Sequence, residues 1–371
     1  MNKEWKKYKL GDIGTIVGGA TPSTSVEKYY GGDIPWLTPK DLSNFNDRFI
    51  EHGERNITQA GLDSCSAQLL PAGSVLFSSR APIGYVAIAK NPIATNQGFK
   101  SVIPNTKIVD SMFLYYLLVY NKDNIEALGS GTTFKEVSGA TMKNVEVCLP
   151  PMEEQKRIAG ILSALDDKIE LNRRINANLE LQAQTLFNHW FVDIDNTLWR
   201  TKRLGDFFEV KTGKKDANYS TPDGTYPFFT CSQGTLKAPA YSFDGYAILL
   251  AGNGDFNVKR YIGQFEAYQR TYVLMPYENK YHTFLYLLIQ HYLPQITGGS
   301  RGSVIKFITK SNIADFEFKI PNTNFDNKLK VLDSIYRVVD NNNTQSLQLS
   351  QLRDTLLPKL MIFYRKICIA Q

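Results

Sequence analysis

The sequence lacks the long apolar segments that mark membrane-spanning and exported proteins. Its longest apolar runs, such as FLYYLLVY at Phe113–Tyr120, are far shorter than the ~20 residues that a helix needs to cross a bilayer. The first residues, MNKEWKKYKLGDIG, contain no apolar core of signal-peptide length. We therefore expect a cytoplasmic protein that has no membrane partner.

Cysteine and histidine are scarce, with four of each, and neither kind is clustered. Cys65, Cys148, Cys231 and Cys368 include no C-x-x-C pair. Because a zinc site needs ligands at close spacing, this dispersion predicts no metal site and reduced thiols.

The motifs of several large enzyme classes are also missing. Gly129-Ser-Gly131 and Gly252-Asn-Gly254 do not continue as G-x-G-x-x-G or as a P-loop, so we interpret both as turns. No H-E-x-x-H or G-x-S-x-G is present, and Leu149-Pro-Pro-Met152 differs from the Asn/Asp-Pro-Pro-aromatic motif of amino-methyltransferases. We therefore predict no catalytic residue in this chain.

Length and charge set wider bounds. The 371 residues exceed the usual size of one compact domain, so two or more domains are expected. The formal net charge of +6 permits an anionic partner such as DNA, but many proteins with this balance bind no nucleic acid.

The chain contains an internal repeat. WKKYKLGD at Trp5–Asp12 returns as WRTKRLGD at Trp199–Asp206, and FLYYLL at Phe113–Leu118 returns as FLYLL at Phe284–Leu288. Each copy mixes short strand-like runs with helical segments and ends in a long helical pattern. The order is therefore globular unit, helix, globular unit, helix, with α+β units.

The two long helical patterns have the heptad spacing of coiled-coil helices, which an isolated globular helix seldom sustains. The predicted seam and partner positions are Ile158, Leu162, Leu165, Ile169, Asn172, Asn176, Leu179, Leu186 and Trp190 in the first helix, and Leu332, Val339, Asn342, Leu349, Leu356 and Leu360 in the second.

Three of these seam positions are asparagines. Asn172 and Asn176 interrupt the first seam, and Asn342 falls in the second copy where Asn172 falls in the first. At core positions such amides cost stability but fix register; alternatively they face solvent on a skewed helix. In the second helix, Pro358 should end or kink the helix near its carboxyl end.

Two matched helices in one chain most simply pair with each other in antiparallel fashion. The sequence therefore predicts an α+β protein with two similar globular domains joined by two long antiparallel coiled-coil helices. The predicted boundaries are 1–150 for the first globular domain, 151–195 for the first helix, 196–322 for the second globular domain and 323–371 for the second helix.

Basic and amide side chains in loop-like segments are the candidate DNA contacts. Arg and Lys can pair with guanine or phosphate, and Asn and Gln can read adenine, although for any one residue a solvated surface role is more common. The candidates are Lys40, Ser79, Arg80, Asn96, Gln97 and Lys135 in the first unit, and Lys214, Lys215, Asn253, Lys259, Arg260, Arg270 and Arg301 in the second.

Several of these segments together resemble the specificity subunit of Type I restriction-modification enzymes. The resemblance covers essentially the whole chain and its repeat order. It is carried by GSGTTF at Gly129–Phe134, LPPMEEQKRI at Leu149–Ile158, QTLFNHWFVD at Gln184–Asp193 and LRDTLLPKLM at Leu352–Met361. Two segments depart from the family pattern, Pro321–Asp326 and the tail after Met361.

This resemblance implies a non-catalytic subunit that binds no cofactor itself and has two target-recognition domains. Each domain would read one half of a split, asymmetric site in double-stranded DNA, and the paired helices would set the gap. The implied partners are two methyltransferase subunits that bind S-adenosylmethionine, and restriction or motor subunits that use ATP and Mg. The alternative from the residues alone is a coiled-coil scaffold with two ligand-binding domains and no DNA.

Overall fold

A computed structural model describes residues 5–131, 135–194, 197–298 and 306–362. The chain divides into two compact units. The first comprises residues 1–172 and 344–371, and the second comprises residues 173–343. The predicted α+β class with two similar globular parts and long antiparallel helices is confirmed. No helix among the described residues is long and apolar enough to span a membrane.

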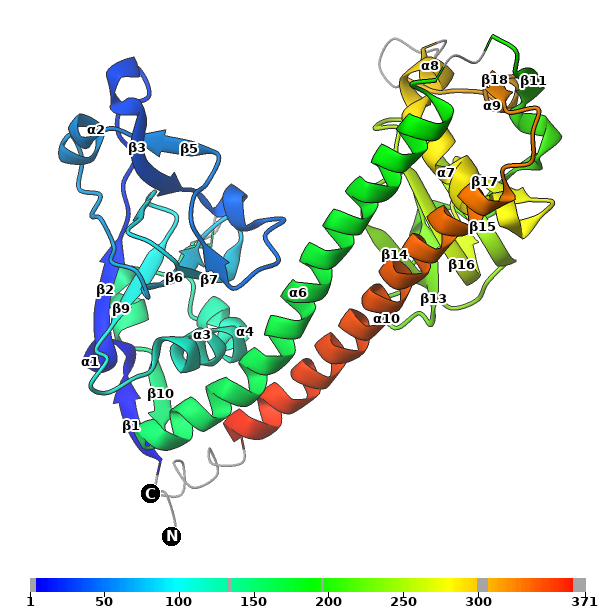
Figure 1. Ribbon diagram of the computed structural model, residues 1–371. Helices are drawn as coiled ribbons and strands as arrows, with labels where there is room; N and C mark the ends of the chain where they lie inside the picture. The colour runs from blue at the N-terminus through cyan, green and yellow to red at the C-terminus, as the bar shows by residue number, and fades with distance from the viewer. Residues whose placement is uncertain (1–4, 132–134, 195–196, 299–305, 363–371) are drawn as a thin grey trace. The chain divides into compact units, whose positions relative to one another are not determined.

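The globular part of the first unit is built on a five-stranded and a three-stranded sheet, which Figure 1 shows in blue and cyan. The larger sheet has the order β2 (Gly14–Gly18), β9 (Lys100–Pro104), β6 (Val75–Ser79), β7 (Ile83–Ala89) and β4 (Phe49–Ile50). The smaller sheet has the order β5 (Arg55–Ile57), β3 (Tyr30–Leu37) and β8 (Ala94–Thr95), and a separate pair joins β1 (Lys6–Lys9) to β10 (Glu146–Leu149).

Short helices cover this part of the first unit. They are α1 (Leu10–Ile13), η1 (Glu27–Tyr29), η2 (Pro39–Leu42), α2 (Gln59–Asp63), α3 (Ser111–Tyr120), α4 (Lys122–Ala127) and α5 (Gly139–Lys143). The side chain of Asp110 caps α3 by accepting a hydrogen bond from the backbone N–H of Phe113. The apolar face of α3 then packs on β6 and β7, so that Phe77 and Phe113 share one core and are fully buried.

The globular part of the second unit has one six-stranded sheet, in the order β12 (Phe208–Thr212), β17 (Thr271–Pro276), β15 (Phe243–Ala251), β16 (Val258–Ala267), β13 (Tyr226–Phe229) and β14 (Thr235–Ala238). A separate pair joins β11 (Arg200–Arg203) to β18 (Glu317–Ile320). The helices are η3 (Leu204–Asp206), η4 (Ala217–Tyr219), η5 (Asn279–Tyr281), α7 (His282–His291), α8 (Leu293–Thr297) and α9 (Lys310–Ala314).

Two glycines show how closely the copies repeat. Gly19 follows β2, and Gly213 follows β12 at the same place in the second copy. A Cβ at Gly19 would lie 2.1 Å from the carbonyl oxygen of Thr95, and a Cβ at Gly213 would lie 2.1 Å from that of Ala267. Each glycine therefore permits a close backbone approach that any side chain would block.

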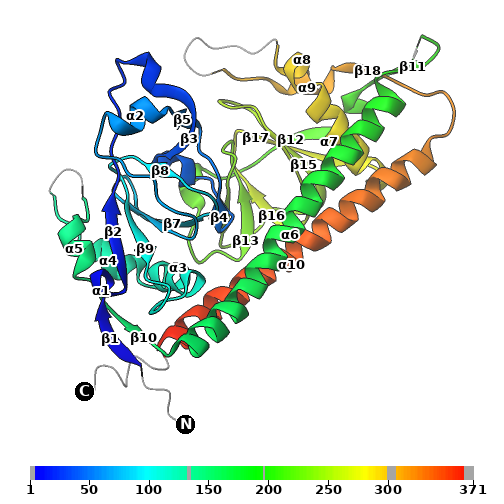
Figure 2. The same ribbon diagram turned by 60° about the vertical axis from the view of Figure 1, so that its left-hand side comes forward.

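The long helices are α6 (Met152–Phe191) and α10 (Asp326–Ile362), and in each unit their segments lie side by side (Figure 1, Figure 2). In the first unit Arg353 of α10 donates to Asp166 of α6 at 2.7 Å. In the second unit the Lys328 ammonium lies 5.8 Å from the ring centre of Trp190. Further contacts fix the direction within each unit: Asn172 meets Gln345 in the first and Asn176 meets Asn343 in the second. In each unit the numbers therefore rise along α6 as they fall along α10, so the segments are antiparallel.

The seam asparagines are buried or half-buried and hydrogen-bonded between the helices. Asn172 donates to the Gln345 side chain at 2.9 Å in the first unit. Asn176 donates to Asn343 and accepts from Asn342, both at 2.8 Å, in the second. The structure therefore places these amides in the helix seam rather than in solvent.

The other predicted seam residues are all buried or half-buried. Ile158, Leu162, Ile169, Leu332 and Val339 are buried, while Leu165, Leu179, Leu186, Trp190, Leu349, Leu356 and Leu360 are half-buried. The pattern missed Phe187, Tyr336 and Leu357, which are buried. Pro358 was expected to end or kink the helix; it lies inside α10, which continues to Ile362, so the helix does not end at this proline.

The cysteines follow the expectation only in part. Cys65 and Cys231 are free thiols. Cys148 is disulfide-bonded, which corrects the prediction of reduced thiols. Among the described residues, no three side chains of His, Cys, Asp or Glu gather as a metal site would require.

Candidate nucleic-acid interface

One end of the larger sheet in the first unit carries a group of neighbouring turns, which we call the first rim. The first rim comprises residues 18–21, 38–40, 79–82, 95–99 and 135–137. Backbone hydrogen bonds tie these turns together: Ala20 donates to Thr95, Asn96 to Leu37, Ser79 to Gly98 and Val137 to Ser79, at 2.7–3.0 Å. The rim lies where β2 and β6 end and where β7 and β9 begin.

The corresponding end of the sheet in the second unit carries the second rim, which comprises residues 212–216, 230–232, 252–257, 268–270 and 306–308. Its backbone bonds match those of the first rim. Tyr268 donates to Phe229, Gly252 to Arg270 and Ile308 to Gly252, at 2.9–3.1 Å. The rim lies where β12 and β15 end and where β16 and β17 begin.

The structure brings the first unit's predicted DNA contacts together on the first rim. Lys40, Gln97 and Lys135 are exposed, and Arg80 and Asn96 are half-buried. The Asn96 side chain accepts the Gly98 N–H at 2.8 Å, and Gln97 hydrogen-bonds to Thr21. These contacts hold two amide side chains at neighbouring positions on the rim.

Ionic contacts link the basic residues of the first rim to carboxylates. Lys40 pairs with Glu54 at 3.0 Å, while Arg80 and Lys100 share Glu136 at 3.6 and 3.1 Å. Lys100 lies beside the rim and was not predicted, because it falls within β9 rather than in a loop-like segment. Of these ionic contacts, the Lys40–Glu54 pair is exposed on both sides. Such a pair contributes about 0–1 kcal/mol to stability, so a DNA phosphate can compete with Glu54 for Lys40.

Most of the second unit's candidates lie on or over the second rim. Lys214 and Arg270 are exposed, and Lys215 and Asn253 are half-buried. The Lys215 ammonium lies 4.5 Å from the ring centre of Tyr219. Lys306 is also exposed there and was not among the predicted contacts. Arg301 lies outside the described residues.

Lys259 reaches the second rim from β16. Its ammonium donates to the carbonyl oxygens of Ser232 and Gly234 at 2.6 and 3.3 Å. Burial lowers the pKa of Lys259, because a partly desolvated ammonium loses hydration.

Two predicted contacts have side chains that face the interior. Ser79 is fully buried, and its hydroxyl donates to the Gly98 carbonyl at 3.2 Å. The Arg260 side chain is 7% exposed, and its guanidinium donates to both carboxylate oxygens of Asp340 on α10. Because neither side chain offers surface to a ligand, we correct both predictions and assign these residues to internal contacts.

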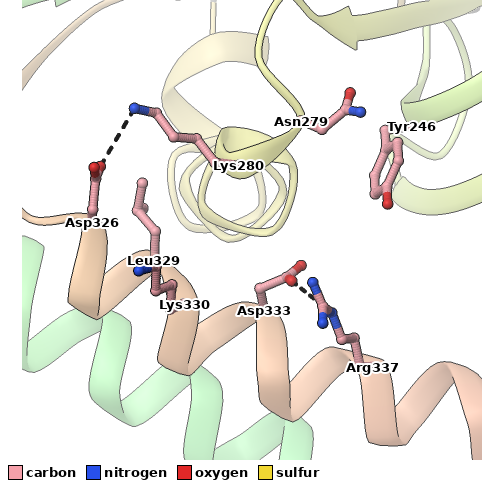
Figure 3. Close-up of a pocket in the computed structure, with 8 residues that line it drawn as sticks. All are labelled: Tyr246, Asn279, Lys280, Asp326, Leu329, Lys330, Asp333 and Arg337. Carbon is pink, nitrogen blue, oxygen red and sulfur yellow. Dashed lines mark ion pairs between the residues drawn. The ribbon is translucent and has the colours of Figure 1, made fainter.

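A cavity of about 280 Å³ lies in the second unit beside the start of α10 (Figure 3). Lys280 pairs with Asp326 at 3.5 Å, and Arg337 pairs with Asp333 at 2.9 Å, as the dashed lines show. Tyr246, Asn279, Leu329 and Lys330 complete the lining. Its charges are largely balanced by these pairs, and none of the candidate DNA contacts that the structure describes lines it.

Comparison with known proteins places this arrangement in a known class. The family model described as "Type I restriction modification DNA specificity domain" matches residues 2–181 and 196–351. The chain is 34% identical to the Type I restriction enzyme MjaIX specificity subunit of Methanocaldococcus jannaschii, covering 97% of this chain and 93% of that one. The chain belongs to the Type I restriction-modification specificity subunits, and its two copies are the two target-recognition domains of that family.

Two further likenesses agree with this assignment. The EcoDI specificity subunit of Escherichia coli is 39% identical over 42% of this chain and 35% of its own length. The crystal structure of the Type I restriction-modification S subunit from M. genitalium covers 97% of this chain and 96% of its own, with a TM-score of 0.58 and 19% identity. The latter likeness concerns the fold.

Proposed function

We propose that this chain is the DNA sequence-recognition subunit of a Type I restriction-modification complex. Each target-recognition domain binds one half of a split, asymmetric site in double-stranded DNA through its rim. The chain performs no chemistry and binds no cofactor. Two methyltransferase subunits carry S-adenosylmethionine, restriction subunits carry ATP and Mg, and the complex works in the cytoplasm.

The observation that supports this proposal most strongly is the clustering on the two rims. Arg, Lys, Asn and Gln side chains from segments that are separate in the sequence lie together at the same end of each sheet. These are the side chains that contact phosphates and read base edges. The proposed contacts are Lys40, Arg80, Asn96, Gln97 and Lys135 on the first rim, and Lys214, Lys215, Asn253, Lys259 and Arg270 on the second.

The rims differ in sequence although their backbone bonding repeats. Thr95-Asn96-Gln97-Gly98 occupies the place that Ala267-Tyr268-Gln269-Arg270 takes in the second unit. Two rims with the same frame and different side chains suit the recognition of two different half-sites.

Co-expression tests the proposal. The chain is expressed with a methyltransferase subunit encoded beside it, and adenine methylation is mapped across the host genome. We expect one split motif with methylated adenines in both halves, and we expect exchange of residues 1–150 to change one half only. A stable complex that methylates no such motif would contradict the proposal.

A binding experiment separates this function from a scaffold that binds no DNA. Neutralising phosphates releases counterions, so the affinity of the complex for duplex DNA should fall linearly with salt on a logarithmic plot. Duplex binding that is absent at low salt would favour the scaffold.

A further inference from the structure

A buried arginine connects the globular part of the first unit to its long helices. The Arg48 side chain is 3% exposed and precedes β4. Its Nε and Nη2 donate to the two carboxylate oxygens of Glu170 at 2.9 and 3.1 Å, and its backbone N–H donates to Glu170 at 3.1 Å. Nη2 also pairs with Asp167, so one residue makes four contacts with α6.

The second unit has a contact of the same kind. Arg260, in β16, donates through Nη1 to the two carboxylate oxygens of Asp340 on α10 at 2.7 and 2.9 Å. Its guanidinium lies 4.7 Å from the ring centre of Tyr336, one turn earlier on α10.

The two carboxylates occupy the same position of the repeat. The numbers of Glu170 and Asp340 differ by the same amount as those of the seam pair Asn172 and Asn342. The arginines do not correspond, because one precedes a short edge strand and the other lies within a long strand. Each globular part therefore reaches one equivalent helix position from a different place in its sheet.

These contacts differ in kind from the surface ion pairs of the chain. Lys90 and Glu51 are both more than half exposed, and such a pair constrains little. The Arg48 and Arg260 side chains are 3% and 7% exposed. Arg48 meets Glu170 through two nitrogens, and such a planar fork accepts a narrow range of orientations. Arg260 donates from Nη1 alone to Asp340, which is 41% exposed, and the Tyr336 ring beside its guanidinium limits its orientation further. Apolar packing between a sheet and a helix has no comparable directionality.

We propose that Arg48 and Arg260 are positioning residues that hold each target-recognition domain in one orientation on its helices and so keep the accepted gap between half-sites narrow. This inference rests on the proposed function. On this inference the helices set the length of the gap, and the two arginines limit how far the accepted gap can vary.

The test measures methylation of DNA substrates in which the gap is shortened or lengthened by one base pair while both half-sites stay intact. We expect Arg260→Met to raise the rate on off-gap substrates relative to the natural gap by about tenfold, with the same half-site bases. Arg48→Met should do the same. Lys90→Met, which removes an exposed pair, is the matched control and should leave the ratio unchanged.

A double variant separates positioning from stability. Arg260→Met with Asp340→Leu replaces the ion pair by apolar contact, which restores stability in many proteins. We expect the double variant to melt at or above the temperature of Arg260→Met while the broad gap tolerance remains. Narrow tolerance in folded Arg260→Met, or tolerance that returns to normal together with the melting temperature, would overturn the inference.

The methylation result that would contradict the proposed function differs from the result that would contradict this inference alone. If the unaltered complex methylates no split site, the proposed function is wrong and the inference falls with it. If the unaltered complex shows one gap and both arginine variants keep that gap, only the inference is wrong.

Discussion

The two units share a frame and differ in the sheet built upon it. Both have a two-stranded pair that closes the globular part, β1 with β10 and β11 with β18. Both have a glycine that lets two turns meet, Gly19 and Gly213. In contrast, the first unit divides its strands between two sheets and the second joins six strands in one.

The comparison shows which features of a unit are tied to the long helices and which are free to vary with the rims. The repeated features lie near the long helices or at the bonds that hold the rim turns together. The features that vary are strand number, loop length and the side chains on the rims. This division suits the proposed recognition of two unlike half-sites, because new loops can then arise without altering the helix seam.

The helix cores give the largest expected effect. Phe187 of the second unit and Leu357 of the first are buried at equivalent positions of the two long helices. Removing a buried aromatic side chain costs about 3–5 kcal/mol, and removing a leucine costs about 2–5 kcal/mol, since each leaves a cavity. We expect Phe187→Ala to lower the free energy of unfolding at least as much as Leu357→Ala, as measured in urea.

Leu181→Ala is the matched control for this pair, because the side chain is 67% exposed on the same helix as Phe187. Its effect should stay within about 0.5 kcal/mol. An equally small loss for Phe187→Ala would show that the aromatic core does not stabilise the second unit.

An acid-sensitive residue distinguishes the second unit from the first. His282 begins α7 and is fully buried, whereas Ser111 begins α3 in the first unit. Burial lowers the pKa of His282 to about 4, and its Nδ1 has no hydrogen-bond partner among the described residues. Nε2 contacts the Ala247 carbonyl at 3.0 Å, where the neutral ring can donate.

The sign of the pH effect follows from this lowered pKa. Above pH ~6.5 the imidazole is neutral in both the folded and the unfolded chain, and its contribution is fully present. As the pH falls towards about 4, only the unfolded chain takes up the proton, so stability is lost, by about 3 kcal/mol at most.

Urea unfolding at pH 7 and pH 5 measures this effect. We expect the second unit to lose stability between these pH values in the unaltered protein, and His282→Gln to lose less. Equal pH dependence in the two proteins would show that His282 does not carry the acid sensitivity.

The smallest effect concerns the rims. Lys135 and Lys214 are exposed on the first and second rims. If each neutralises one phosphate, either Lys→Ala variant should reduce the slope of log affinity against log salt by about 1, without changing the bases recognised. A slope that changes for one variant alone would mean that the two rims do not bind DNA in the same way.

The sequence was sufficient for the architecture because repeats and heptads leave strong periodic signals. The matching places of Asn172 and Asn342 in the two copies already implied matched helices, and both amides lie in the seam. The local preference of proline against a helix interior does not end α10 at Pro358, where Leu357 and Met361 on either side are buried in a core of the first unit. Phe187 and Leu357 were missed because a strict heptad seam is narrower than the apolar face that a globular core covers.

The candidate interface was less predictable from the sequence. Gln97 and Arg270 were predicted as contacts because they fall in loop-like segments. Both lie on the rims, because turns at one end of a sheet lie close together. The sequence did not show to which face of its strand a side chain points. Arg260 contacts α10, whereas its neighbour Lys259 contacts the second rim. No local sequence pattern predicts the ion pair of Arg48 with Glu170, because the two residues are 122 positions apart.

The central claim is that the helices set the gap between half-sites and the globular parts set the bases. It is tested most directly by inserting four helix-forming residues near Asn176, after Arg173 in α6, and four more after Asn343 in α10. Each insertion adds one turn, about 6 Å of helix. The account predicts that methylation mapping finds the same two half-sites with a gap longer by about one or two base pairs, at ~3.4 Å each. Altered half-site bases with an unchanged gap would contradict it.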